Sequence, residues 1–287
     1  MNKNNKDIIS KISFINVSLL IFIFIYILFN KRIKIRGTKI KLTFEICLLN
    51  ILEDISFSAI TSSMNSLKLG NFNFNEPLDW SDKSVNTLVI ENPRYFYSVI
   101  SEMIAQSMGD DGSFILSEGL ETVSFSRTVD VITDLFSINL NEKRFQNGIY
   151  RELSEIATHD TSYQIMELYS RINSEVSELI SDFRWDMSFD ELNEITPLFK
   201  AVNLVVDEES MTLGEKIITY MELSEQFLNK KLFVIVNMKS CMDERTLNSF
   251  FKDVNYRGFK LLLIESKDSE STDYEIKTII DNDLCQL

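Results

Sequence analysis

The sequence has few glycines and lacks every glycine-rich phosphate loop. Only 8 of its 287 residues are glycine, and neither G-x-x-x-x-G-K-[ST] nor G-x-G-x-x-G occurs anywhere in the chain. Both motifs supply backbone amides that wrap a phosphate group. Their absence argues against nucleotide hydrolysis and against binding of a dinucleotide cofactor.

Histidine and cysteine are scarce as well. His159 is the single histidine, and no serine stands in a G-x-S-x-G setting, so a hydrolase triad has little support. Cys47, Cys241 and Cys285 are scattered without C-x-x-C spacing. The sequence therefore predicts a reducing compartment, and it predicts neither a disulfide framework nor a zinc site.

Positive charge is in short supply after the first 63 residues. Residues 1–63 hold nine Lys or Arg against four acids, whereas residues 64–287 hold 20 against 39, which leaves that part near minus 19. Such a charge argues against non-specific binding to polyanions. Any contact with nucleic acid therefore needs a local basic surface or bridging cations.

The longest uncharged run is "ISFINVSLLIFIFIYILF" at residues 12–29, followed by a basic stretch. One interpretation is a short transmembrane helix whose basic flank keeps the following residues in the cytoplasm, as in a membrane-anchored adaptor. The other is a start codon assigned too early, because Met64 opens a stretch that resembles a natural domain start. We favour the second interpretation, which makes residues 1–63 an extension outside the domain.

Short apolar runs alternate with helical patterns over much of the remaining chain. Runs at residues 86–91, 232–236 and 259–266 predict buried strands. A helix follows the first run, with Asn92 as its N-cap, Pro93 at its first position and Gly109 at its end. Strand, helix and strand repeat at the C-terminus, where Gly258 ends the helix. Such crossovers make parallel sheets, so we expect an α/β head that resembles a nucleotide-binding fold without its phosphate loop.

The middle of the chain has a different, helical periodicity. Apolar residues recur at helical spacing over 165–183 and, in a shorter stripe, over 145–156. We expect two helices, joined by "ATHDTS" at residues 157–162, to pair antiparallel. The sequence thus predicts a head made of residues 64–138 and 206–287, with an inserted α-helical leg at residues 139–205.

One acidic group stands out after the longer stripe: Asp186, Asp190, Glu191 and Glu194. On helical spacing three of them share a face and repel one another unless a cation or solvent separates them. Carboxylate oxygens of this kind suit calcium better than a transition metal. A calcium site and a solvated acidic turn both remain open.

A small basic group, Lys143, Arg144 and Arg151, lies around the start of the first leg helix. Such a group is commonly a solvated face. It becomes a candidate contact for DNA phosphates if an oligomer repeats it around an opening.

Four stretches together resemble the Csn2 family of CRISPR-associated proteins from type II-A systems. They are "NTLVIENPRYFYSVI" from Asn86, "DVITDLFSINLN" from Asp130, the run from Leu228 to Ser266, and "IIDNDL" from Ile279. The resemblance covers essentially Met64 to Leu287, in order, and residues 1–63 have no counterpart in it.

The resemblance implies a homotetrameric ring whose subunits have an α/β head and a helical leg, without established catalytic activity. Rings of this family thread the end of double-stranded DNA, depend on calcium for assembly, and support spacer acquisition beside the integrase complex and the RNA-guided effector nuclease. The resemblance also implies calcium ligands near residues 186–194. We therefore expect a cytoplasmic, non-catalytic protein that binds DNA ends. The alternatives are a degenerate nucleotide-dependent or nuclease enzyme and the membrane-anchored adaptor.

Overall fold

The structure, a computed structural model, describes residues 66–160 and 162–287. The apolar run at residues 12–29, the remainder of the predicted extension 1–63, and Cys47 lie outside the described residues. Within the described ranges, none of the helices has both the length and the apolar character needed to cross a membrane.

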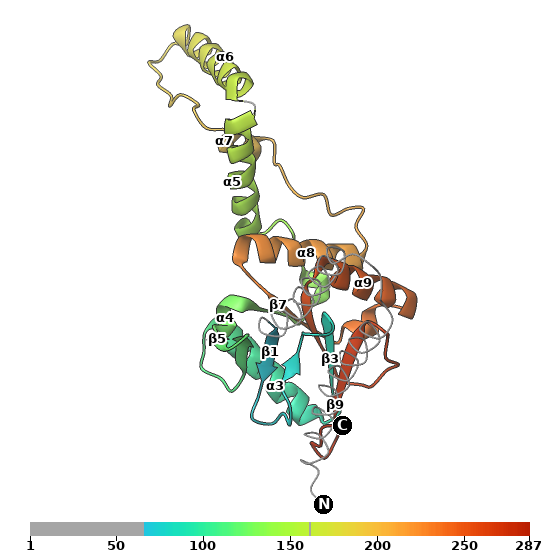
Figure 1. Cartoon of the computed structure of the whole chain (residues 1–287). Helices are drawn as coiled ribbons and strands as arrows, with labels where there is room; N and C mark the ends of the chain where they lie inside the picture. The colour runs from blue at the N-terminus through green and yellow to red at the C-terminus, as the bar shows by residue number, and fades with distance from the viewer. Residues whose placement is uncertain (1–65, 161) are drawn as a thin grey trace, which may run out of the picture. The chain divides into compact units, whose positions relative to one another are not determined.

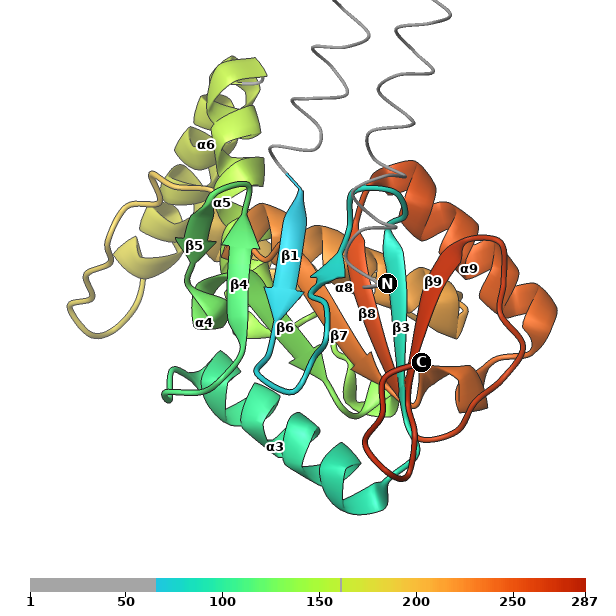
Figure 2. The ribbon, with the colours of Figure 1, turned by 60° about the horizontal axis from the view of Figure 1, so that its bottom comes forward.

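Five parallel strands form the main sheet, in the order β6-β7-β8-β3-β9; β7, β3 and β9 are labelled in Figure 1 and all five strands in Figure 2. The strands are β3 (Val85–Ile90), β6 (Val129–Ile132), β7 (Leu232–Val236), β8 (Lys260–Glu265) and β9 (Glu275–Ile280). The middle strands are almost continuously buried, as expected of a parallel sheet that is covered on both faces. The predicted α/β class with a parallel sheet is confirmed.

Helices cover one face of this sheet. Alternate residues of β7 point to opposite faces, and Phe233 and Ile235 pack against α8 (Leu213–Leu228), α9 (Glu244–Arg257) and the first turn of α5 (Lys143–Asp160). The other face of β7 packs against α3 (Pro93–Met108) and a second sheet.

The second sheet is antiparallel, with the order β2-β1-β4-β5. Its strands are β1 (Leu67–Gly70), β2 (Leu78–Asp79), β4 (Ile115–Glu118) and β5 (Glu121–Val123), and they lie on the same side of the main sheet as α3 (Figure 2). Buried Trp80 donates its indole N–H to the carbonyl of Leu261 at 3.1 Å and so links the two sheets. A helical turn, α4 (Phe125–Thr128), leads from β5 into β6.

The predicted helix ends are confirmed where capping residues signal them. Asn92 accepts hydrogen bonds from the amides of Arg94 and Tyr95 at the start of α3, and Gly109 ends it with φ 110°. Gly258 ends α9 with φ 78°. Only glycine adopts such left-handed angles without steric cost, which is why both residues stop their helices.

The antiparallel helix pair predicted for the leg is wrong. The leg contains α5, α6 (Ser162–Ser181) and α7 (Thr196–Ala201), and only one residue separates the end of α5 from the start of α6, within the stretch expected to form the loop. An antiparallel helix pair needs a connection of two to five residues. The two apolar stripes therefore do not cover each other, and the outer residues Leu179 and Phe183 are 75% and 52% exposed.

The non-helical segment of residues 182–195 runs back along α6, where an antiparallel helix was expected. Asn173 of α6 donates to the carbonyl of Leu192 at 3.1 Å and accepts from its amide at 2.8 Å. The first residue of helix α7 is Thr196, and its N-cap residue is Ile195. The Thr196 hydroxyl hydrogen-bonds to the hydroxyl of Ser154 on α5, at 3.1 Å.

Candidate nucleic-acid interface

The three basic residues expected to contact DNA all lie on α5 and are exposed. Arg144 and Arg151 are seven residues apart, which places them on one face of the helix about 10 Å apart along its axis. Lys143 is turned about 100° from Arg144 around the helix. The structure therefore brings two of the three predicted cations into one row.

Arg144 is contacted by three neighbouring side chains. Its Nε lies 2.8 Å from a carboxylate oxygen of Glu142, and its Nη2 donates to the Tyr220 hydroxyl at 2.9 Å. Its guanidinium lies 4.8 Å from the centre of the Phe145 ring. Burial and the adjacent Asp130 raise the pKa of Tyr220 to about 12, so its hydroxyl keeps the proton that it donates to Asp130 at 2.9 Å. Arg144 is thus a pre-positioned cation.

Three cations that no sequence motif indicated share a hollow with Arg144: Arg127, Lys230 and Lys231. The hollow has a volume of about 540 Å³. A signal was present, because these residues stand just before the apolar runs that form β6 and β7. Neighbouring parallel strands begin at the same edge of a sheet, so the side chains that precede them are brought together.

The four acids proposed as calcium ligands lie on the return segment. Asp186, Asp190, Glu191 and Glu194 are all exposed, and residues 186–194 are not helical, so the shared helical face expected for three of them is absent. Within residues 66–160 and 162–287, no three His, Cys, Asp or Glu side chains are grouped to hold a metal ion. Calcium binding by these residues stays a prediction.

At the edge of the main sheet where nucleotide-binding α/β proteins hold phosphate, several backbone amides donate to side chains of the same chain. Such proteins bind ligands outside the carboxyl ends of the strands. After β3, the Asn92 side chain accepts hydrogen bonds from the amides of Arg94 and Tyr95 in the first turn of α3. After β7, the amide of Lys239 donates to Glu265 at 3.0 Å, and after β8, the amide of Ser266 donates to Asn237 at 3.0 Å. These amides are therefore not free to wrap a phosphate.

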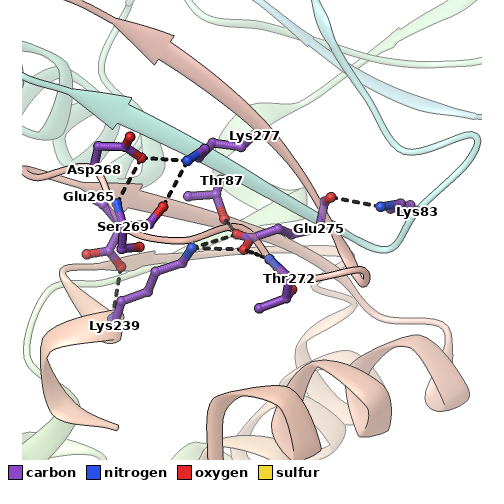
Figure 3. Close-up of polar contacts among 9 residues, drawn as sticks. All are labelled: Lys83, Thr87, Lys239, Glu265, Asp268, Ser269, Thr272, Glu275 and Lys277. Carbon is purple, nitrogen blue, oxygen red and sulfur yellow. Dashed lines mark hydrogen bonds and ion pairs between the residues drawn. The ribbon is translucent and has the colours of Figure 1, made fainter. Parts of the chain in front are cut away.

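A buried ion pair joins Lys239, which follows β7 at this edge, to Glu275, the first residue of β9 (Figure 3). The Lys239 ammonium is 2.8 Å from Oε2 of Glu275, and these side chains are 7% and 0% exposed. The amide of Thr272 donates to the same carboxylate at 2.8 Å, and the Thr87 hydroxyl donates to it as well. Burial acts to raise the pKa of Glu275, but the hydrogen bonds from Lys239 and Thr87 outweigh it and hold the pKa below its ordinary value.

Glu265 is a second carboxylate near the same ammonium. Burial raises its pKa above the ordinary value, and the Lys239 amide and charge offset this only in part. No motif pointed to these residues. A signal was available in the sequence: Lys239 follows the predicted strand at residues 232–236, and Glu265 lies at the end of the predicted strand at residues 259–266.

Comparison with known proteins gives one family match. The family model described as "CRISPR-associated protein (Cas_Csn2)" matches residues 106–284. Among solved structures the chain is similar to Stu0660 of Streptococcus thermophilus, with 12% identity, 74% of each chain covered and a TM-score of 0.45. It is also similar to the ADP conformation of MJ1267, an ATP-binding cassette of an ABC transporter, with 12% identity, 76% of this chain and 88% of that chain covered, and a TM-score of 0.40. No curated protein matches the chain.

Proposed function

Because the chain belongs to the Csn2 family of CRISPR-associated proteins, we propose that it is a non-catalytic protein that binds the ends of double-stranded DNA during spacer acquisition. In this proposal four copies form a ring in the cytoplasm, and calcium supports the assembled form. The adaptation integrase complex and the RNA-guided effector nuclease are its protein partners. The family match at residues 106–284 supports the proposal, because it includes α5 and α6 of the leg and β7 and β8 of the head.

The observation that carries DNA binding is the placement of Arg144 and Arg151 on one face of α5 in an otherwise acidic chain. Arg144 is already fixed by its hydrogen bond to the Tyr220 hydroxyl, so little side-chain freedom is lost when it meets a phosphate. Cations of this kind contact the DNA backbone and carry no base information. Binding is therefore expected to be independent of sequence and sensitive to salt.

The carboxyl edge of the sheet supports the non-catalytic part of the proposal. Asn92 and Glu265 accept hydrogen bonds from the amides that a phosphate loop would use. Lys239 stands after β7, but its ammonium is committed to buried Glu275. A nucleotide would have to displace these internal contacts in order to bind there.

Duplex binding tests the proposal. Fluorescence anisotropy of two duplexes of unrelated sequence, each about 30 base pairs long and measured at two salt concentrations, is expected to give equal affinities that fall steeply with salt. Arg144→Gln with Arg151→Gln is expected to weaken binding. The matched control, Arg245→Gln with Lys252→Gln, removes the same charge from exposed positions on α9 and is expected to bind like the wild type. Absence of duplex binding, cleavage of the duplex, or consumption of ATP would contradict the proposal.

Light scattering of the full chain tests the proposed assembly. A tetramer has four times the 33.3 kDa mass of one chain. A strictly monomeric protein, with calcium present, would contradict the ring.

A further inference from the structure

We propose that the hollow lined by Arg127, Arg144, Lys230 and Lys231 binds phosphate groups of the DNA backbone. The hollow lies at the amino edge of the main sheet, opposite the edge at which nucleotide-binding α/β proteins hold their ligands. The choice of DNA as the source of the phosphate rests on the proposed function. The presence of an anion site rests on the geometry of the hollow.

Strand pairing brings these cations together from distant parts of the sequence. β6 and β7 are parallel neighbours whose first residues, Val129 and Leu232, stand opposite each other. The amide of Lys231 donates to the carbonyl of Thr128 at 2.8 Å, which continues the pairing by one step before the strands. This pairing brings the residues just before the two strands together, and Arg127 and Lys230 both line the hollow there.

Two of the four cations are fixed by hydrogen bonds to neutral groups, and the charge of half-buried Asp130 also acts on both of them. Lys230 donates its ammonium hydrogens to the carbonyls of Ser126 and Val129, at 2.7 and 2.8 Å. These partners are neutral, and burial lowers the pKa of Lys230, so an arriving anion would stabilise its charged form. Arg144 is fixed by Tyr220, as described above.

The balance of charge around the hollow leaves room for an anion. Glu118 pairs with Lys231 at 2.6 Å and Glu142 pairs with Arg144, and both pairs are well exposed to solvent. Exposed pairs of this kind are weak and open readily. Arg127, in the last turn of α4, forms no ion pair within the part of the chain that the structure describes. It is the cation with the most freedom to contact a phosphate.

The lining favours a nucleic-acid backbone over a free nucleotide. Beside the four cations it contains Ser126, Thr128, Leu228 and Asn229. No aromatic side chain is among these residues, so the hollow offers no platform on which a base could stack. Arg151 follows Arg144 two turns along the same face of α5, which extends the row of cations beyond the hollow.

Arg127→Gln with Lys231→Gln, made in the full chain, tests the site. Lys230 is left intact because its ammonium bonds to backbone carbonyls. The double variant is expected to bind a duplex of about 30 base pairs roughly tenfold more weakly than the wild type. The slope of log affinity against log salt is expected to become shallower by about 0.9 for each phosphate that the variant leaves unneutralised. The control Arg245→Gln with Lys252→Gln is expected to change neither quantity.

The outcomes separate the site from the proposed function. If the wild type binds duplex and the double variant binds equally well, the hollow is not a DNA contact, although DNA binding stands. If the wild type binds no duplex, the proposed function fails. Tripolyphosphate then serves as the probe: a rise in melting temperature in the wild type but not in the double variant supports an anion site of another kind. If tripolyphosphate changes the melting temperatures of the wild type and the double variant equally, the hollow is not an anion site. Arg127→Gln alone, which breaks no ion pair, replaces the double variant if that protein does not fold.

Discussion

The ammonium of Lys239 lies 2.8 Å from the carboxylate of Glu275, and neither side chain is more than 7% exposed. Lys239 follows β7 and Glu275 begins β9, so the pair spans the two strands, β8 and β3, that lie between them. A buried charge that loses its partner is costly, because the surrounding protein does not solvate it as water does. This pair therefore links the outer strand β9 to the centre of the head.

Glu275→Gln is expected to destabilise the protein by about 3 kcal/mol, because it leaves the buried Lys239 ammonium without its main partner. Glu265 remains nearby and keeps the loss toward the low end of the usual range. Urea unfolding of both proteins at pH 7 measures the difference. An unchanged free energy of unfolding would show that the pair does not contribute to stability.

Glu265→Gln makes the same chemical change a short distance away and is expected to have the opposite effect. The pKa of Glu265 is raised by burial, so its ionised form costs stability at pH 7. Glutamine keeps an oxygen that can accept the Lys239 amide hydrogen. We expect a free energy of unfolding equal to or above that of the wild type. A loss as large as that of Glu275→Gln would contradict this assignment of the two carboxylates.

The two carboxylates also predict opposite pH dependences. The folded-state pKa of Glu275 lies below the ordinary value of 4.5, so its contribution is present above that value and is lost as pH falls through the folded pKa. The raised pKa of Glu265 favours folding below 4.5, and that contribution is lost as pH rises through its folded pKa. Unfolding free energies from pH 3 to 8 are expected to converge at low pH for the wild type and Glu275→Gln. If the unfolding free energies of the wild type and Glu275→Gln differ by the same amount at every pH, the lowered pKa of Glu275 is contradicted.

Much of the head could be predicted because local signals and burial agree there. Asn92, Pro93, Gly109 and Gly258 act within one helical turn, and the continuous apolar run of β7 has no stable place except inside a parallel sheet. The leg could not be predicted in the same way. Its helical periodicity was real, but which surface covers a stripe depends on tertiary contacts such as the bonds between Asn173 and Leu192.

The candidate sites show the same division between local and tertiary information. Arg144 and Arg151 share a face because helical spacing fixes it. Arg127 and Lys230 come together only through the pairing of β6 with β7, although they lie far apart in the sequence. The prediction that Asp186 and Asp190 share one face of a helix is wrong, because their segment is not helical.

Calcium is expected to stabilise the wild type through the acidic return segment. Asp190→Asn with Glu191→Gln removes the charges of two oxygen ligands, so the rise in melting temperature on adding calcium should shrink or vanish. Glu167→Gln with Glu178→Gln, at exposed positions on α6, is the matched control and should respond like the wild type. Equal responses to calcium in all three proteins would place the ligands elsewhere.

Threading of a DNA end through a ring is tested most directly by topology. A linear duplex and a covalently closed circle of the same length and sequence are compared by gel shift with calcium present. The linear duplex is expected to bind and the circle to bind poorly, and cutting the circle once should restore binding, because a closed ring admits DNA only through an end. Equal binding of the circle and the linear duplex would contradict the threading of DNA ends.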